Sequence, residues 1–178
     1  VASVVAVSVV WRYILQDDGL LNSLLAVFGI NGPDWLHDTR FALPALMIMT
    51  IWRNMGTLMI IFLAGLQAIP TELKEAAAVD GAGRWRTFTS ITLPLMKPTI
   101  VMCLVYCVTG SILAFDQFFI LTKGGPNNST MTVVELIYNF AFDSKKDLGM
   151  AAALSLLVLV ALVIINSIQM RGMRDNTK

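Results

Sequence analysis

Three polar side chains lie at helical spacing inside one long apolar stretch of the chain. Thr50, Asn54 and Thr57 are four and three residues apart, so on a helix they share one face. Polar residues within a membrane span usually face a protein interior or a water-filled path. Their hydroxyl and amide groups suit the hydroxyl groups of a sugar. The spacing therefore predicts a lining for the path of a polar solute.

A second face is expected in the next apolar stretch. Gly110, Leu113 and Gln117 are three and four residues apart, and Tyr106 lies one turn earlier. A flat apolar or aromatic surface beside an amide suits the ring faces and hydroxyls of a sugar. The alternative is that both sets only pack helices together, which is a common use of Thr and Gly in membrane spans. The sequence leaves both interpretations open.

Two charged residues, Arg53 and Asp116, stand within these stretches. A charge in mid-bilayer is costly, so the two are expected to line a cavity or to pair with each other. Asp116 is near the outer end of its stretch and could instead reach water. A proton relay is disfavoured because no His or Glu accompanies them in the spans. Arg53 would suit a phosphate, so a glycerol phosphate ester stays open beside a sugar.

The elements that must position these residues are membrane helices. The chain has 178 residues, of which 56% are apolar and 14% charged, far below the roughly 25% charged residues of a soluble domain. A bilayer core needs roughly 20 apolar residues as helix. We expect an all-α, polytopic transmembrane bundle of about four spans, near residues 1–15, 41–69, 98–122 and 148–170. A soluble protein with buried helices is the less favoured alternative.

The connections between the spans differ in character. The apolar patch 20–28 is too short to cross a bilayer and predicts an interfacial or re-entrant helix. Residues 123–128, KGGPNN, are a dense turn signal. Residues 132–142 predict a short helix with interfacial aromatic residues. Nothing basic precedes Arg12, so we expect part of the natural protein to precede residue 1.

Residues 71–94 form a polar, helix-forming segment between two apolar stretches. Pro70 ends the preceding span, and Thr71 is the expected N-cap of a new helix. Glu72 and Glu75 lie near the positive end of its dipole. Leu73, Ala76 and Ala77 then form one weakly apolar face with small side chains.

A turn and a second short helix are expected to follow. Asp80, Gly81 and Gly83 supply a turn and a helix stop. Pro94 is expected to end the second helix, and Pro98 to begin the next span. The segment is therefore a helix-turn-helix at the membrane surface. Its small alanine residues would allow a partner to approach closely, although an ordinary helical loop is the alternative.

The distribution of basic residues predicts the orientation. Seven Lys and Arg residues lie on the side of residues 71–94 and the C-terminus, against five on the other side: Lys74, Arg84, Arg86, Lys97, Arg171, Arg174 and Lys178, against Arg12, Arg40, Lys123, Lys145 and Lys146. We expect the 71–94 loop and the C-terminus to be cytoplasmic.

The loop also resembles a known family. Its motif residues, Glu75, Ala76, Ala77, Gly81, Ile91, Leu93 and Pro94, match the EAA signature of permease subunits of binding-protein-dependent ABC importers. Trp52, the run LAGLQAIP at 63–70, FDQF at 115–118, LT at 121–122 and GGP at 124–126 are similar to its carbohydrate branch, of the maltose and sn-glycerol-3-phosphate type. The resemblance covers about residues 12–171.

The resemblance implies a function and partners. Such permeases usually have six spans, so this chain would be an N-terminally incomplete fragment of one permease domain over residues 1–178. They sit in the bacterial cytoplasmic (inner) membrane beside a second permease subunit and receive a sugar from an extracytoplasmic sugar-binding protein. Two ATP-binding cassette subunits, which bind ATP and Mg²⁺, grip the EAA loop at residues 71–94. The two polar faces fall where the maltose permease subunit contacts its sugar.

The absence of catalytic motifs supports a transporter subunit that is not an enzyme. The chain has no Gly-rich phosphate loop ending in Lys-Ser/Thr, no HExxH motif and a single histidine, His37, in a polar loop. Cys103 and Cys107 are expected to be small apolar residues on one helix face, with no metal or cofactor in this chain. A net charge of +1 gives no sign of nucleic acid binding. A secondary transporter or channel without ATP coupling is the alternative.

Overall fold

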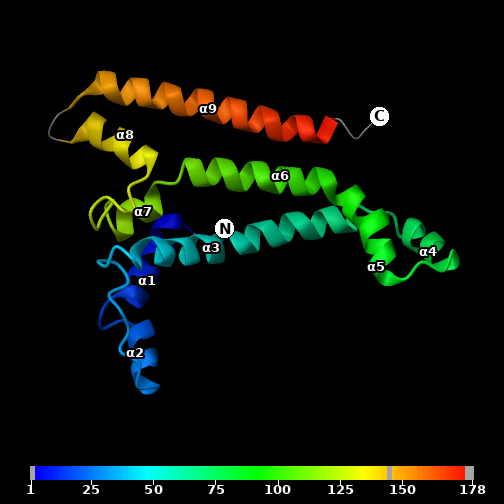
Figure 1. Cartoon of the computed structure of the whole chain (residues 1–178), viewed down its shortest axis with the longest axis horizontal. Helices are drawn as coiled ribbons and strands as arrows, with labels where there is room; N and C mark the ends of the chain where they lie inside the picture. The colour runs from blue at the N-terminus through cyan, green and yellow to red at the C-terminus, as the bar shows by residue number, and fades with distance from the viewer. Residues whose placement is uncertain (1–2, 144–145, 175–178) are drawn as a thin grey trace. The chain divides into compact units, whose positions relative to one another are not determined.

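The computed structural model of the chain describes residues 3–143 and 146–174, which form helices joined by turns, with no strand among them (Figure 1). The prediction of an all-α fold is therefore confirmed. Val1, Lys145 and Lys178, which entered the span and orientation predictions, lie outside the described residues.

Ten helical elements follow one another along the described part of the chain. They are α1 (Val4–Leu15), α2 (Leu20–Val27), α3 (Ala42–Gln67), α4 (Thr71–Val79), α5 (Arg84–Thr87), the π-helical turn η1 (Phe88–Thr92), α6 (Leu93–Ile112), α7 (Asp116–Leu121), α8 (Val133–Phe142) and α9 (Leu148–Arg174). The short helices predicted near 20–28 and 132–142 are present as α2 and α8.

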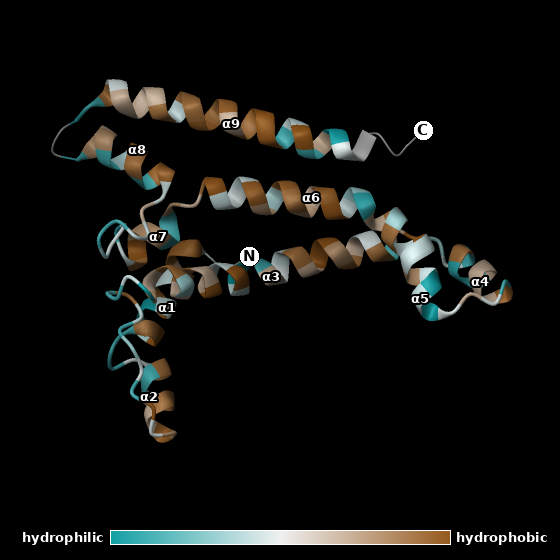
Figure 2. Ribbon diagram, viewed as in Figure 1, coloured by the Kyte–Doolittle hydropathy of each residue, from teal (hydrophilic) through white to brown (hydrophobic). Residues whose placement is uncertain are grey.

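Three runs in the described residues are long and apolar enough to cross a bilayer: Ala42–Gln67, Arg84–Leu121 and Leu148–Gly172. Their apolar residues show as brown bands along α3, α6 and α9 (Figure 2). The predicted span at 1–15 is different. Its helix α1 has 12 residues, fewer than the roughly 20 that a bilayer requires, so three of the about four expected spans have a membrane-crossing helix.

The predicted boundaries of the third span were wrong at both ends. Helices α5, η1 and α6 run on without a break, so Pro94 does not end a helix, and Pro98 lies inside α6. Pro98 has no N–H, so the carbonyl of Pro94 receives no helical hydrogen bond from it. The π-helical turn η1 ends just before Pro94, so two irregularities of the helix lie close together. At the other end, residues 113–115 interrupt the helix between α6 and α7.

The chain divides into two compact units, which are described separately. The first comprises residues 1–54 and 110–159. Its core forms where α1, the first half of α3 and α7 bury apolar side chains together with Leu36. Leu46 and Met49 of α3 are fully buried, and Trp11, Trp35 and Phe118 pack around them. This packing holds the first half of α3 in place.

The predicted turn at 123–128 is confirmed, and buried hydrogen bonds of Thr130 stabilise it. Lys123, Gly124, Asn127 and Asn128 have positive φ angles. The hydroxyl of Thr130 donates to the carbonyl of Gly125 at 2.7 Å and lies 2.7 Å from the hydroxyl of Thr122. Because Thr130 is only 2% exposed, these bonds are shielded from water and fix the turn.

Glu135, in the first turn of α8, is the most unusual buried group of this unit. It is 1% exposed, its backbone N–H donates to the Thr132 hydroxyl at 3.2 Å, and its Oε2 is buried without a hydrogen-bond partner among the described residues. Burial raises the pKa of the Glu135 carboxyl above its ordinary value of 4.5, against the lowering effect of the Thr132 backbone hydrogen bond. The Glu135 carboxyl therefore holds its proton more tightly in the folded chain than in the unfolded chain.

Replacing Glu135 with Gln is expected to flatten the pH dependence of stability. Because the folded pKa is raised, the unfolded state ionises first, and the free energy of unfolding falls as pH rises from about 4.5 through the folded pKa. Gln carries no such charge, so at neutral pH the variant should be the more stable protein. Thermal unfolding in detergent between pH 4 and pH 8 measures this. Parallel pH profiles for the two proteins would contradict the assignment.

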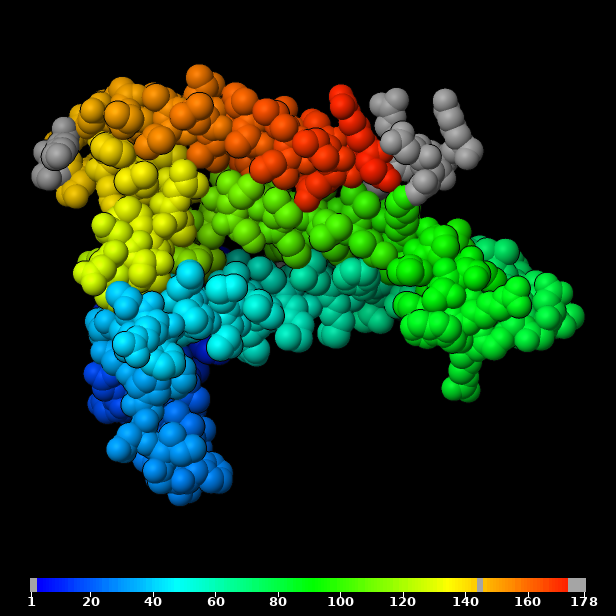
Figure 3. All heavy atoms as spheres, in the orientation of Figure 1, coloured from blue at the N-terminus to red at the C-terminus, as the bar shows by residue number. Residues whose placement is uncertain are grey.

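The second unit comprises residues 55–109 and 160–178. In it α3 and α6 approach closely at Gly65, where an added Cβ would lie 2.5 Å from Oγ1 of Thr99. The side chains of the two helices fill the space between their ribbons (Figure 3). The Thr109 hydroxyl of α6 donates to Oδ1 of Asn166 of α9 at 3.2 Å. Small residues and interhelical hydrogen bonds are the usual means of helix association in lipid.

Replacing Gly65 with Val is expected to lower stability by about 1–3 kcal/mol, because the larger side chain must displace Thr99 or separate the helices. Gly56→Val, in the same helix, is a matched control, since nothing lies within 4 Å of its added Cβ. Thermal unfolding of the purified proteins in detergent compares them. Equal losses in the two variants would show that helix propensity, and not close packing, explains the effect.

Candidate functional site: a helix-turn-helix groove and a polar helix face

Helix α4 begins one residue earlier than the sequence indicated. Pro70 occupies the N-cap position, with φ −57° and ψ 133°, and Thr71 is the first helical residue and not the cap. The fixed φ of proline suits the extended cap conformation. Glu72 in the first turn faces the positive end of the helix dipole, as expected.

The turn after α4 is a Schellman motif. The N–H of Gly81 donates to the carbonyl of Ala78 at 3.1 Å, and the N–H of Ala82 donates to the carbonyl of Ala77 at 2.9 Å. Gly81 has a φ of +74°, a conformation that side chains with a Cβ disfavour. These bonds satisfy the last carbonyls of α4 and fix the angle at which α5 leaves it. The predicted turn is confirmed.

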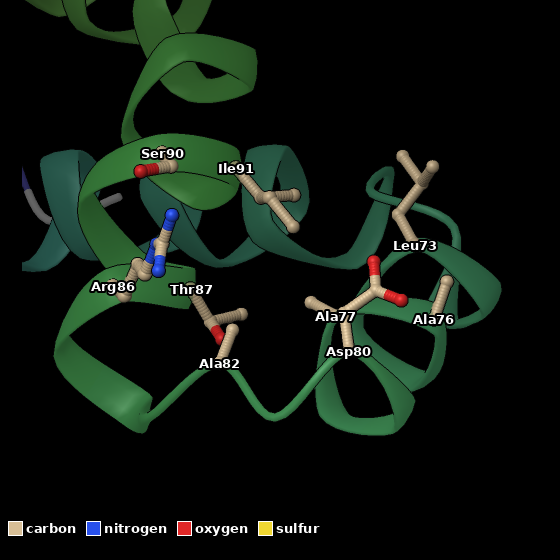
Figure 4. A pocket seen from close by; sticks show the side chains of 9 residues that line it. All are labelled: Leu73, Ala76, Ala77, Asp80, Ala82, Arg86, Thr87, Ser90 and Ile91. Atoms are coloured by element: carbon tan, nitrogen blue, oxygen red, sulfur yellow. The ribbon is translucent and has the colours of Figure 1, made fainter.

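The two arms of this helix-turn-helix enclose a groove of about 370 Å³. Figure 4 shows side chains of α4 and of the α5–η1 arm facing each other across it. Its lining is mainly small, with one acidic and one basic side chain: Leu73, Ala76, Ala77, Asp80, Ala82, Arg86, Thr87, Ser90 and Ile91. Ala77 is 7% exposed, so its methyl group packs against the chain itself at the base of the groove.

The seven coupling residues predicted from the sequence lie in four different places. Ala76, Ala77 and Ile91 line the groove, and Gly81 forms the turn. Glu75 is exposed and outside the groove lining. Leu93 and Pro94 lie at the start of α6, where both are exposed and outside the groove lining.

Sequence reasoning missed several residues of the groove, among them Asp80, Arg86, Thr87 and Ser90. Asp80 was taken only as a turn residue. Its spacing of four and three from Ala76 and Ala77 places it on their helix face, which was the signal available. Of the large apolar residues Trp85, Phe88 and Ile91 in the second arm, Ile91 alone lines the groove.

Large apolar side chains stand exposed around the helix-turn-helix. Val79 is 88% exposed and Trp85 is 77% exposed. A smaller hollow of about 290 Å³ on the same element is lined by Lys74, Arg84 and Phe88 among others. Exposed aromatic and basic residues beside a small-residue groove are features of a surface on which another protein docks.

The first polar face is carried by one unbroken helix, as predicted. Thr50, Asn54 and Thr57 all lie within α3 and are each half-buried. The Thr50 hydroxyl donates to the carbonyl of Leu46 at 2.8 Å, so its lone pairs remain for a ligand. Asn54 accepts a long hydrogen bond of 3.4 Å from Arg53 through Oδ1 and keeps its amide donors.

The second polar face does not form as predicted. Gly110 lies near the end of α6, Leu113 follows the end of that helix, and Gln117 belongs to α7. Because residues 113–115 are not helical, a spacing of three and four residues no longer places Gly110, Leu113 and Gln117 on one helix face. Gln117 is 5% exposed and Leu113 is 47% exposed, which confirms that they have different environments.

Arg53 and Asp116 do not pair with each other. Asp116 is the first residue of α7 and is exposed, where the helix dipole favours its charge. In the described part of the chain the one close contact between a carboxylate and a basic side chain joins Oδ1 of Asp34 and Nδ1 of His37 at 3.0 Å, and the His37 side chain is 77% exposed. The described residues contain no group of three or more His, Cys, Asp or Glu side chains placed to hold a metal.

The sequence matches the family described as "Binding-protein-dependent transport system inner membrane component" over residues 3–171. The chain is 41% identical to the multiple sugar-binding transport system permease protein MsmF of Streptococcus mutans over 76% of its length, and 37% identical to the trehalose/maltose transport system permease protein MalF of Thermococcus litoralis over 80%. It spans about half of these relatives, 47% and 48% of their lengths.

A solved structure has the same fold. The chain is similar, with a TM-score of 0.84 and 27% identity, to a chain of a bacterial ABC transporter involved in the import of the acidic polysaccharide alginate. The likeness covers 99% of this chain and 62% of that one. A second structure of the alginate transporter, in complex with an alginate pentasaccharide-bound periplasmic protein, gives a TM-score of 0.85.

Proposed function

Because this chain belongs to the family of binding-protein-dependent transport system inner membrane components, we propose that it is part of the membrane-spanning permease subunit of an ATP-driven carbohydrate importer. The observation that carries this proposal is the α4–α5 helix-turn-helix, with its fixed Schellman turn and small-residue groove. The permease would supply alternating access, and a separate partner chain would bind ATP and Mg²⁺ and hydrolyse the nucleotide.

The helix-turn-helix, residues 71–94, is proposed as the cytoplasmic coupling loop. A helix is stiff, and the hydrogen-bonded turn at Gly81 makes the two arms move as one body. Because α5 continues through η1 into α6 without a break, a displacement of the loop is passed directly to a membrane-spanning helix. This continuity favours ATP coupling over a secondary transporter or channel, which would have no use for such an element.

The remaining partners follow from the same proposal. A second permease subunit would complete the path, and an extracytoplasmic sugar-binding protein would deliver the solute. The loop and the C-terminus would face the cytoplasm. The direction of transport would come from a difference in solute affinity between outward- and inward-facing states.

Co-purification tests the coupling role. The full-length permease is expressed with its ATPase subunit, and the tagged permease is purified in detergent. The ATPase subunit should be retained by the wild-type protein and released by an Ala76→Trp variant, which fills the groove. Gly56→Val, in α3, is the control that should retain it. A permease that never retains an ATPase subunit would contradict the proposal.

The polar residues Thr50, Asn54, Thr57, Gly110 and Gln117, together with Leu113, are proposed to line the solute path. Replacing Asn54 with Leu removes an amide that can bond sugar hydroxyls, so the KM for uptake should rise about tenfold with less change in the maximal rate. Uptake by proteoliposomes at saturating ATP measures this. Ser23→Ala, at an exposed position of α2, is a control outside both the path and the coupling loop. A wild-type KM in Asn54→Leu and Gln117→Leu would remove both residues from the site.

A further inference from the structure

We propose that Arg53, oriented by Asn54, forms an anion-binding subsite on the solute path, so that the imported carbohydrate is acidic. The shared ligand chemistry is an oxyanion attached to a sugar: a carboxylate, a sulfonate or a phosphate. This inference rests on the proposed import function and names the substrate class of the same path.

Arg53 lies deep within a membrane-spanning helix. It is eleven residues beyond Ala42, the first of the 26 residues of α3, which places it about 17 Å along the helix axis at 1.5 Å per residue. A similar length of helix follows it. Arginine side chains reach the interface only from positions near the ends of a span. At this depth, the guanidinium requires a compensating partner inside the protein or in a water-filled path.

The described residues do not supply that partner. Nη2 of Arg53 donates to Oδ1 of Asn54 at 3.4 Å, a long bond to a neutral acceptor. Nη1 is buried and has no hydrogen-bond partner among the described residues. The one contact between a carboxylate and a basic side chain in the described part of the chain, Asp34 with His37, does not involve Arg53. A guanidinium offers five donors in a fixed fork, and most of this fork is unused.

The position of Arg53 on the helix directs it towards the proposed path. Thr50, Arg53 and Asn54 are at positions i, i+3 and i+4, which share one helix face, and all three are half-buried. Their neighbours on the other side, Ile51 and Met55, are 59% and 58% exposed. Arg53 therefore shares the face of the polar residues and not the broad apolar face.

This arrangement recognises an oxyanion and disfavours a neutral sugar. The planar fork of arginine pairs with two oxygens of a carboxylate, sulfonate or phosphate at once. The Asn54 oxygen accepts a long hydrogen bond from the guanidinium, while the Asn54 amide and the Thr50 oxygen remain available for sugar hydroxyls. A neutral sugar in the same place would leave the buried charge without a counter-charge.

The experiment compares matched pairs of sugars that differ in one charged group. The complete importer, with the full-length permease, its partner permease, ATPase subunits and binding protein, is reconstituted in proteoliposomes. The probes are digalacturonate against galactobiose, sulfoquinovose against glucose, and maltose 6-phosphate against maltose. ATP-dependent accumulation is measured by mass spectrometry for the wild type, Arg53→Gln and Arg53→Lys. Arg40→Gln is the matched control, because Arg40 is an exposed arginine just before the same helix.

We expect the wild type to import the acidic member of at least one pair in preference to its neutral counterpart, and the pair identifies the oxyanion. Arg53→Gln should raise the KM for that acidic sugar on the order of 10- to 100-fold, Arg53→Lys should keep the preference in part, and Arg40→Gln should not change it. If the Arg53→Gln variant fails to assemble, the subsite is tested by the preference of the wild type for the acidic sugar and by the partial preference of Arg53→Lys.

Two results would overturn the subsite in distinguishable ways. Import of neutral sugars in preference to acidic ones, with Arg53→Gln unchanged, removes the anion subsite and leaves the import function standing. Failure of the complete importer to accumulate any of the six sugars removes the proposed carbohydrate import together with the subsite.

Discussion

Replacing Gly81 with Val should uncouple ATP hydrolysis from transport, lowering binding-protein-stimulated uptake on the order of 10- to 100-fold. Gly81 has a φ of +74°, and a β-branched residue held in this region costs about 1–3 kcal/mol. Nothing lies within 4 Å of an added Cβ there, so the penalty is conformational. To relieve it, the turn must open, and the two Schellman hydrogen bonds that fix the angle between α4 and α5 are then lost.

Gly83 provides the control for this prediction, because it has a φ of −66° and also has open space around an added Cβ. Gly83→Val should therefore keep most of the coupled activity. Gly81→Asn should be tolerated better than Gly81→Val, since Asn accepts positive φ more readily. Uptake and ATP hydrolysis are measured on the same proteoliposomes. Equal activity of Gly81→Val and Gly83→Val would contradict the role of the turn.

Replacing Ala77 with Glu should have the largest effect on the groove itself. Ala77 is 7% exposed and lies at the base of the groove. A glutamate there must either bury a carboxylate, which costs several kcal/mol without a partner, or force the arms of the helix-turn-helix apart. Either outcome changes the surface to which the ATPase subunit would bind. We expect loss of the ATPase subunit on purification and loss of uptake.

Thr71→Glu, in the first turn of the same helix, adds the same charge at an exposed position outside both hollows and should retain much more of the ATPase subunit. Circular dichroism of both variants verifies that the helical content is preserved. Retention of a fully coupled ATPase subunit by Ala77→Glu would show that the base of the groove plays no part in docking.

The helix-turn-helix could be predicted from the sequence because its signals are local. Pro70 and Gly81 each determine the backbone at their own position, and the start of α4 differs from the prediction by one residue. The groove could be predicted less well. Which residues face each other across it depends on the angle set by the turn, so Asp80 and Arg86 were not recognised as lining residues.

The third span shows why membrane helices are harder to delimit. Pro98 was interpreted as a helix start, yet it lies inside α6, since flanking structure can compensate for the missing N–H in a membrane helix. No proline near Ile112 indicates from the sequence that the helix ends there. Phe115 leaves helical geometry with φ −142° and ψ −63°, and Ala114 beside it is buried. The break therefore lies where the chain packs against other parts of the protein. The periodicity of a single sequence carries no information about such packing.

Site-specific cross-linking tests the central claim most directly. Val79, 88% exposed at the end of α4, is replaced by Cys in a full-length permease whose Cys103 and Cys107 are changed to Ser. A thiol cross-linker is then applied to inside-out membrane vesicles that contain the assembled importer. We expect Val79→Cys to cross-link to the ATPase subunit, with a yield that changes when ATP is added. Labelling of this cysteine from the extracytoplasmic side by a membrane-impermeant reagent, without any cross-link to the ATPase subunit, would contradict it.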